Sequence, residues 1–292
     1  MRNLSVNVTN KKRSNFNFKD FKSISSRYYN IDDHWLEWFI GLFEGDGCLV
    51  FNPKKGFRFE IISTHKPTLQ KIKNKFKFGK VSLCTKIDNN LEKWRYSVED
   101  RYSIYLLLLI LNGNIVLNHR YNNIVKIIGY FNNYSFKGKP YMWIVRTKFE
   151  QVLPTLNDAW FSGFVDAEGH FGCPIERGRK FVSHYISICF EVGQNGEAWF
   201  FEYCHNLFGG GILYPNYRNE VTHNRIIFKG SKTGKNNVTL VFSYFDGFPL
   251  VTKLRSYNKW RIMHKYLLEK KHLKIDNLPK LLILAKSINR KQ

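Results

Sequence analysis

The chain contains the stretch Trp38-Phe39-Ile40-Gly41-Leu42-Phe43-Glu44-Gly45-Asp46-Gly47, and a second copy of the same pattern begins 122 residues further on. The second copy is Trp160-Phe161-Ser162-Gly163-Phe164-Val165-Asp166-Ala167-Glu168-Gly169. Each copy is typical of the last turns of an apolar helix that stops at a glycine. Each also places two small residues four apart on one helix face, where a second backbone could approach closely. These small pairs are Gly41 with Gly45 and Gly163 with Ala167, and the expected partner of each copy is the other copy.

An acidic residue lies just beyond each small pair, Asp46 in the first copy and Glu168 in the second. The macrodipole disfavours negative charge at a helix C-terminus, and two carboxylates brought together there would repel each other. A divalent metal ion would hold such a pair together. The alternative is two ordinary core helices whose terminal acids are solvated or act as caps, but this does not explain the repeated acid-small-acid-glycine ending.

The composition describes a globular, strongly basic protein. The 292 residues include 46 Lys and Arg against 23 Asp and Glu, which gives a formal charge of +23. Apolar residues make up 43% of the chain and aromatic residues 16%, which excludes a disordered basic tail and allows two domains of ordinary size. Such a charge favours a polyanionic partner, with nucleic acid as the first choice and an anionic membrane surface as the second.

Cysteines and apolar runs narrow the class further. The five cysteines are scattered without a Cys-x-x-Cys pair, so we expect neither a zinc site nor a disulfide framework. The same pattern favours a reducing compartment. The longest apolar run, Ile104 to Leu111, is too short to span a bilayer, so no membrane partner is expected. Residues 1–19 resemble a mitochondrial presequence only loosely, because they lack an amphipathic period.

The two copies resemble the signature of the LAGLIDADG homing endonuclease family. Phe39 to Gly47 matches the signature, as does Phe161 to Gly169. The resemblance implies an α+β fold of two pseudo-symmetric αββαββα domains. In that fold the signature helices pair at the pseudo-twofold axis, and the two sheets form a saddle over DNA.

We expect a flexible basic N-terminal arm at 1–30, a first domain at 31–130, an interdomain linker at 131–157 and a second domain at 158–292. In the first domain the patterns predict helices at about 33–46, 67–77, 101–111 and 121–130, and strands at 48–52, 57–63, 79–86 and 94–99. In the second domain they predict strands at 170–175, 181–193, 211–217, 225–228 and 238–242, and helices at about 196–207, 252–268 and 278–288. Phe190-Glu191-Val192 corresponds to Phe59-Glu60-Ile61 at an offset of 131 residues, which indicates an internal duplication.

By resemblance, the acids at the eighth signature position, Asp46 and Glu168, are catalytic metal ligands for Mg²⁺ or Mn²⁺. Magnesium prefers oxygen ligands and keeps several waters, so few protein carboxylates suffice. The acids two residues earlier, Glu44 and Asp166, are expected to lie elsewhere on the helix surface and to stabilise the structure.

Two further catalytic residues are implied by the resemblance. Gln194, at the end of a strand, lies where the family often has glutamine, and its first-half counterpart is Ser63. Lys253 resembles the family's catalytic lysine, and its first-half counterpart falls near Asn118, with Arg120 close by. The alternative for any single lysine is a contact with phosphate or solvent.

Basic residues in or beside the hairpin turns are expected to bind DNA, with plain solubility as the alternative for each. They are Lys54, Lys55, Arg58, Arg177, Arg179 and Lys180.

The leading hypothesis is therefore a monomeric, sequence-specific, metal-dependent endonuclease that cuts double-stranded DNA at a long target. The second is an RNA maturase that assists splicing of its host intron, alone or beside cleavage. The third is a DNA-binding module that has lost cutting, against which the intact Asp46 and Glu168 argue. By resemblance to organellar intron-encoded members, a mitochondrial location is expected.

Overall fold

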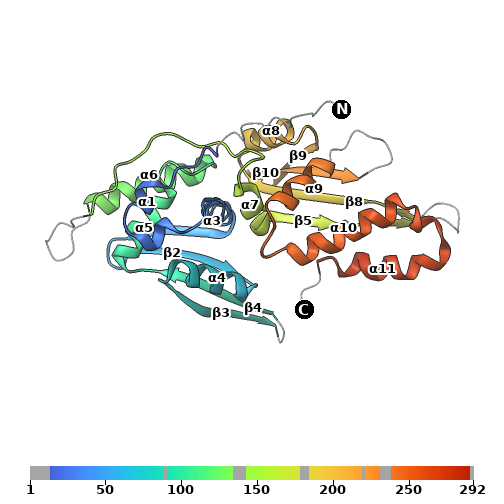
Figure 1. Cartoon of the computed structure of the whole chain (residues 1–292), viewed down its shortest axis with the longest axis horizontal. Coiled ribbons are helices and arrows are strands. Elements are labelled where there is room, and N and C mark those ends of the chain that lie inside the picture. The colour runs from blue at the N-terminus through green and yellow to red at the C-terminus, as the bar shows by residue number, and fades with distance from the viewer. Residues whose placement is uncertain are drawn as a thin grey trace, which may run out of the picture.

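A central pair of helices divides the molecule into two similar halves. The computed structural model describes residues 14–88, 91–133, 143–177, 184–218, 221–230 and 238–289. Helices α3 (Asp33–Asp46) and α7 (Trp160–Glu168) lie side by side at the centre, with the first half of the chain on one side and the second half on the other (Figure 1).

Each half contains a four-stranded antiparallel sheet that starts directly after its central helix. The first sheet has the order β1-β2-β4-β3, with β1 (Gly47–Asn52), β2 (Gly56–Ser63), β3 (Lys80–Asp88) and β4 (Leu91–Val98). The second has the order β5-β8-β10-β9, with β5 (Gly169–Gly172), β8 (Ile188–Asn195), β9 (Ile212–Arg218) and β10 (Val221–Gly230). A separate hairpin joins β6 (Ile175–Arg177) to β7 (His184–Ile186).

The helices follow the same order in both halves. The first half has α4 (Lys66–Phe76), α5 (Arg101–Leu111) and α6 (Asn118–Asn133), preceded by the short α1 (Lys19–Lys22) and α2 (Ser26–Tyr29). The second half has α8 (Ala198–Leu207), α9 (Val238–Gly247) and α10 (Leu254–Leu268). The second half then adds η1 (Lys271–Leu273), η2 (Ile275–Asn277) and α11 (Leu278–Ser287), of which α11 packs beside α10.

Strand register shows that the two halves are duplicates. Gly47 pairs with Ile61 in the first sheet, and Gly169 pairs with Val192 in the second. Because each glycine ends its signature, Ile61 and Val192 are equivalent, which confirms the offset of 131 residues expected from the sequence. The predicted α+β fold with two pseudo-symmetric halves is confirmed.

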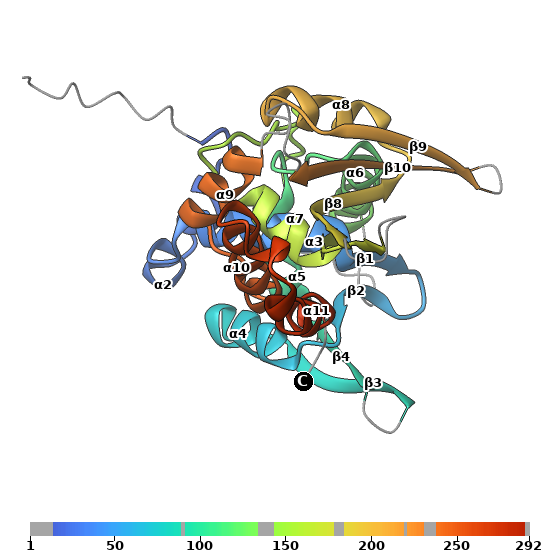
Figure 2. The same cartoon turned by 90° about the vertical axis from the view of Figure 1, so that its right-hand side faces the viewer.

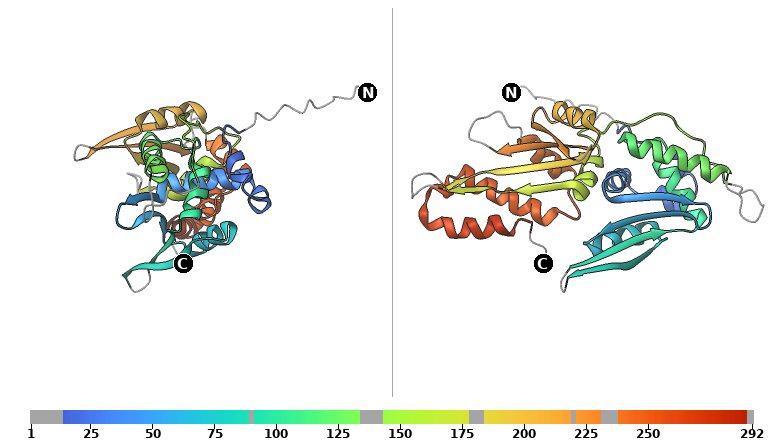
Figure 3. Two further views of the ribbon diagram at one scale, coloured as in Figure 1. Left: turned by 90° about the vertical axis from the view of Figure 1, so that its left-hand side faces the viewer. Right: turned by 180° about the vertical axis from the view of Figure 1, so that it is seen from behind.

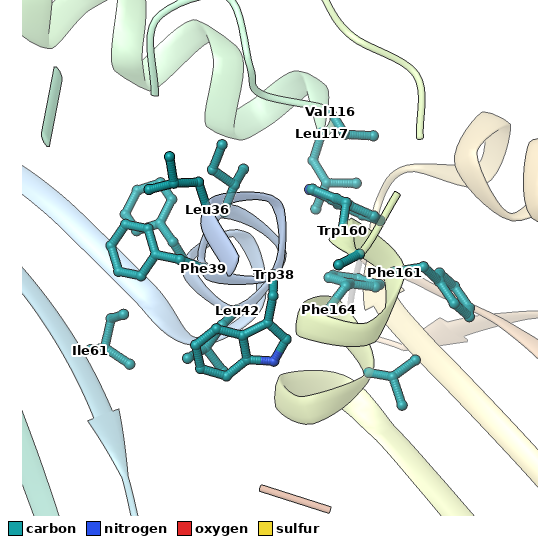
Figure 4. Close-up of a cluster of buried hydrophobic side chains, with 14 of the residues drawn as sticks. Leu36, Trp38, Phe39, Leu42, Ile61, Val116, Leu117, Trp160, Phe161 and Phe164 are labelled. Atoms are coloured by element: carbon teal, nitrogen blue, oxygen red, sulfur yellow. The ribbon is translucent and has the colours of Figure 1, made fainter. Parts of the chain in front are cut away.

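Side-chain alternation gives each sheet one apolar face and one open face. On β2 the residues Phe57, Phe59 and Ile61 are buried, whereas Arg58 and Glu60 alternate with them on the other face. Figure 4 shows how the apolar side chains of this face and of the central helices pack together, with Ile61 toward Leu42 and Trp160 beside Val116 and Leu117. The β3–β4 and β9–β10 hairpins project from the same side of the molecule (Figure 2), which gives the sheets the saddle arrangement.

The central helices approach so closely that only glycine fits at the crossing. A Cβ atom at Gly41 would overlap the carbonyl oxygen of Trp160, and one at Gly163 would overlap the carbonyl oxygen of Trp38. A Cβ at Gly45 would overlap the Cβ of Ala167. The predicted contact between the two small pairs is therefore confirmed.

The start of the chain differs from the prediction of a flexible arm at 1–30. Residues 1–13 lie outside the described residues, but Phe16, Phe18 and Phe21 are buried in the core of the first half. Phe21 packs on Phe76 of α4, with ring centroids 6.4 Å apart. Their apolar surface outweighs the basic character that suggested an arm.

The prediction of a strand at 238–242 is wrong, because this segment is the first half of α9. Valine, threonine and phenylalanine favour strands, but the buried residues of α9, namely Val238, Val241, Tyr244 and Phe245, recur at helical spacing. Helix α9 is the counterpart of α5, so the internal duplication predicts a helix here although the local propensity favours a strand.

The two halves are connected by a segment that passes from α6 to α7 (Figure 3). Side-chain amides tie it to the first half: Asn132 exchanges two hydrogen bonds with the backbone of Val145, and Asn112 bonds the backbone of Arg146 and Lys148. Among the described residues, no helix is both long enough and apolar enough to span a membrane.

The Gly41→Ala substitution should destabilise the protein by about 1–3 kcal/mol, because the added methyl group has no space between the two backbones. Gly129→Ala is the matched control, since this helical glycine of α6 has open space around its missing Cβ. There alanine should stabilise by about 0.5–1 kcal/mol through backbone entropy. Urea unfolding of the three proteins measures both values, and equal stability of Gly41→Ala and wild type would contradict the close crossing.

Candidate active site

The acids at the sixth signature position are buried and link the two central helices to each other. Trp38 Nε1 of α3 donates a hydrogen bond of 2.8 Å to Asp166 of α7, and Trp160 Nε1 of α7 donates one of 2.8 Å to Glu44 of α3. Both carboxylates are fully enclosed, rather than on the helix surface as predicted. Burial raises the pKa of Glu44 to about 7 and also raises the pKa of Asp166.

The same two acids hold the start of a later helix of their own half, α6 for Glu44 and α10 for Asp166. Glu44 accepts hydrogen bonds of 3.0 and 2.7 Å from the N–H groups of Val116 and Leu117, just before α6. Asp166 accepts three, of 2.7, 2.9 and 2.8 Å, from the N–H groups of residues 251–253, just before α10. A carboxylate at a helix N-terminus is favoured by the macrodipole and by the unsatisfied N–H groups. These acids therefore position helices and have no room to bind a metal ion.

The acids at the eighth position, Asp46 and Glu168, end the two central helices together. The pKa of Glu168 is raised to about 7, first by desolvation and second by the neighbouring Asp46 carboxylate, while the charges of Lys253 and Arg120 lower it. Desolvation also raises the pKa of Asp46, although that residue is exposed, and the same two cations oppose the rise. Among the described residues, neither carboxylate accepts a hydrogen bond or forms an ion pair.

One cation from each half lies over the end of its own central helix. Lys253 Nζ donates hydrogen bonds of 3.0 and 2.7 Å to the carbonyl groups of Val165 and Ala167. Arg120 donates from Nε to the carbonyl of Glu44 at 3.0 Å and from Nη2 to that of Gly45 at 3.2 Å. Each cation thus accounts for unpaired carbonyl groups at a helix C-terminus, and its positive charge stabilises the nearby carboxylates in their ionised form.

The first-half counterpart of Lys253 was expected near Asn118, and both residues lie at the start of a helix whose preceding N–H groups bind the buried acid of their half. The side chain of Asn118 does not face the acids but accepts a hydrogen bond of 2.9 Å from Gln151. Arg120, two residues further along α6, replaces it chemically. The sequence signal for Arg120 was its proximity to Asn118, and only the structure shows that the guanidinium reaches the helix end.

Gln194 lies two residues beyond Val192, which pairs with Gly169, so its backbone is next to the end of α7. Ser63 lies two residues beyond Ile61, which pairs with Gly47, so the expected equivalence of Gln194 and Ser63 holds in the register. The side-chain oxygen of Gln194 accepts a hydrogen bond of 3.1 Å from the N–H of Asn195. This glutamine is near the helix ends, while its contact with the acids stays a prediction.

Of the basic residues expected at DNA, the structure describes two in the β1–β2 turn, one on β2 and one at the end of β6. Lys54 and Lys55 occupy the β1–β2 turn, whose shape is held by the side chain of Asn52. Arg58 is on the open face of β2 and is paired with Glu60. Arg177 ends β6, and Arg179 and Lys180 lie outside the described residues.

The comparisons with known proteins agree with this architecture. A family model described as LAGLIDADG endonuclease matches residues 161–264. The chain is similar to a solved LAGLIDADG meganuclease, I-AabMI bound to uncleaved DNA, with a TM-score of 0.63 and 18% identity over 88% of this chain and 99% of that one. The fold is therefore that of the two-domain LAGLIDADG meganucleases.

Two curated fungal proteins are similar in sequence. A probable intron-encoded endonuclease 4 of Neurospora crassa is 29% identical over 274 residues, which are 91% of this chain and 47% of that protein. The intron-encoded RNA maturase bI4 of Saccharomyces cerevisiae is 24% identical over 256 residues, which are 85% of this chain and 34% of that protein. The chain thus spans half or less of the length of these relatives. The chain thus resembles LAGLIDADG endonucleases in its repeated signature, in its fold and in the match of residues 161–264 to the family model.

Glu44→Gln should destabilise the fold by about 2–3 kcal/mol, because the amide group of glutamine would turn a donor toward N–H groups that all donate to Glu44. Glu202→Gln is the control, since Glu202 is an exposed residue of α8 and its change should alter stability by less than about 0.5 kcal/mol. Thermal or urea unfolding of the purified proteins measures both changes in the free energy of unfolding. If Glu44→Gln is as stable as the wild type, Glu44 does not anchor the start of α6.

Proposed function

We propose that the protein is a sequence-specific endonuclease that hydrolyses phosphodiester bonds of double-stranded DNA at a long target. The observation that carries this proposal is the meeting of Asp46 and Glu168 at the end of the paired helices, with Lys253 and Arg120 beside them. Carboxylates with raised pKa values are costly for stability, and such groups gather at functional sites. The open faces of the two basic sheets extend from this point and offer a long surface to DNA.

The two carboxylates fit a divalent cation such as Mg²⁺ or Mn²⁺. They supply oxygen donors that no described protein cation neutralises by direct pairing, which is the chemistry that these ions prefer. Within the described residues, no group of three or more His, Cys, Asp or Glu side chains could hold a metal ion. Phosphate oxygens of DNA would therefore complete the donor set.

A cation bound there supplies the Lewis acid that stabilises negative charge on the attacked phosphate. The protein groups contribute the rest. Asp46 and Glu168 would hold the cation from two different helices, so the contact that joins the halves would also fix its place. Lys253 and Arg120 add fixed positive charge next to the phosphates. Gln194 would orient a water molecule in the second half, where Ser63 stands in the first.

We infer that one chain acts alone, because it contains both signature helices. The similarity to intron-encoded fungal proteins supports an origin in a mitochondrial intron and a mitochondrial location.

An RNA maturase is the second candidate function. It is favoured by the similarity to maturase bI4, which extends over 85% of this chain. The same basic charge would serve a host-intron RNA. Retention of Asp46 and Glu168 favours cleavage, because a protein that only binds nucleic acid gains nothing from two acids near phosphates.

Asp46→Asn and Glu168→Gln should each slow cleavage by several orders of magnitude while DNA binding persists, because the cation loses a charged ligand but the basic surface is intact. Asp33→Asn is the control: it is an exposed acid at the opposite end of α3 and should leave cleavage unchanged. Cleavage in Mg²⁺ and binding in Ca²⁺ are measured on duplex DNA that covers the intron-insertion junction. Cleavage by Asp46→Asn at the wild-type rate would refute the ligand assignment, whereas tight binding of intron RNA without any DNA cleavage by the wild type would favour the maturase.

Affinity for duplex DNA should fall by about three orders of magnitude between 50 and 200 mM salt if six or more phosphates are contacted. The Lys54→Gln/Lys55→Gln variant should reduce the slope of log affinity against log salt by about 2, one for each lost phosphate contact. Fluorescence anisotropy at several salt concentrations gives the slope. A flat response of the wild type would contradict a basic DNA-binding surface.

A further inference from the structure

Two arginine–glutamate ion pairs lie on the open faces of the two sheets. In the first sheet Arg95 Nε is 3.1 Å from Glu60 Oε2. In the second sheet Arg225 Nη1 is 3.6 Å from Glu191 Oε2. Neither pair contributes to the helix pair or to the apolar core.

The two pairs occupy equivalent positions of the duplicated fold. Ile62 is opposite Arg95, and Gly193 is opposite Arg225. Since Ile61 is equivalent to Val192, Glu60 corresponds to Glu191 and Arg95 to Arg225. The pseudo-twofold axis between the central helices therefore relates one ion pair to the other.

Both pairs lie close to the candidate active site. Glu60 is opposite Cys48, two residues after Asp46, and Glu191 is opposite His170, two residues after Glu168. Arg95 and Arg225 lie one strand further out, opposite Ile62 and Gly193, so two strand spacings separate each from the signature acid of its half, roughly 10 Å. At about 3.4 Å per base pair, this distance corresponds to two or three base pairs on either side of the cleavage centre.

The arginines retain donors that can reach a ligand. Their side chains are 31% and 39% exposed, and a guanidinium has five N–H donors. Each is held from the side, Arg95 by a hydrogen bond of 3.2 Å from Nη2 to Cys84 Sγ and Arg225 by the ring of Tyr214, 5.5 Å from its Cζ atom. A held guanidinium loses less entropy when it binds.

An acidic side chain on a face that binds DNA repels phosphate, so it needs a reason to be there. Holding an arginine in a fixed orientation is such a reason. Bidentate contact of arginine with O6 and N7 of guanine is the commonest specific contact in the major groove, and glutamate can accept from the N4 amino group of cytosine.

We propose that Arg95 and Arg225 each read a guanine, one in each half of the target, and that Glu60 and Glu191 orient them. This inference rests on the proposed function as a DNA-binding nuclease. The target then contains two G·C base pairs, related by approximate twofold symmetry, two or three base pairs from its centre. The remaining target positions have no such symmetry requirement.

The two sites differ in one respect. Glu60 is also bonded by Arg58, at 3.0 Å from Nε and 2.7 Å from Nη2, and the equivalent of Arg58 in the second sheet is Cys189. Loss of Arg95 leaves Glu60 neutralised, whereas loss of Arg225 leaves Glu191 without an ion-pair partner among the described residues. Arg225→Met should therefore weaken binding to all sequences as well as relax the base preference.

The test selects bound sequences from a randomised duplex library, with Ca²⁺ present so that binding is separated from cleavage. The wild type should prefer guanine at one inner position of each half-site. Arg95→Met should reduce that preference about 5- to 150-fold in one half-site only, and Arg225→Met should do so in the other half-site only. The added change Glu191→Gln should restore general affinity to Arg225→Met without restoring its base preference. Arg261→Met is the control, because Arg261 pairs with Asp246 on the helical side and should leave every preference unchanged.

Three results would overturn the inference. A uniform loss of affinity without a change in base preference would show that both arginines contact phosphates. An effect of either variant on both half-sites would remove the assignment of one arginine to each half, and a wild type with no guanine preference near the centre would remove the readout itself. Failure of the wild type to select any duplex sequence would instead refute the proposed function, and the inference with it.

Discussion

The close crossing of α3 and α7 is the contact on which the rest of the structure depends. At Gly41 and Gly163 each backbone occupies the space that a Cβ atom would need. Because the crossing is tight, the two helices end side by side, and their terminal acids are brought together in spite of their mutual repulsion and of the helix dipoles. Desolvation, and after it the repulsion from Asp46, raises the pKa of Glu168 to about 7. The lysine and the arginine that cover the helix ends offset part of it, and the remainder is what a bound cation would offset.

The two acids of each signature have different tasks because the helix turns between them. Glu44 and Asp166 face the partner helix and accept the indole N–H of its tryptophan, and they anchor α6 and α10. Asp46 and Glu168 lie at the end, where the chain leaves the helix and enters the first strand. The sheets are thus attached rigidly to the acids. The open faces of the sheets and the paired acids are therefore held in one register by the two signature helices.

The sequence predicted much of this arrangement because the residue spacing within the repeated motif determines which side chains share a helix face. Small residues four apart predicted the crossing, and the offset of 131 residues predicted the equivalence of Gln194 and Ser63. The errors came from local readings. Residues 238–242 favour a strand by propensity, yet tertiary packing makes them a helix, as the counterpart α5 indicated. The basic composition of residues 1–30 suggested a flexible arm, but Phe16, Phe18 and Phe21 are buried in the core. The role of Arg120 was beyond sequence alone, because it depends on where a long side chain ends rather than on where its backbone lies.

Two halves in one chain are free to diverge, and the differences between them follow a pattern. The buried acids, the tryptophans and the glycines that join the helices are alike in both halves, because each of them contacts its own counterpart or the equivalent turn. Several positions outside this interface differ, with Lys253 against Arg120, Gln194 against Ser63 and Cys189 against Arg58, although the arginine–glutamate pair is kept in both sheets. A change in the first group disturbs both halves at once, since the interface is shared. A change at the differing positions alters one half alone. The duplicated fold therefore keeps its symmetry where the halves meet, and is free to lose part of it on the open faces.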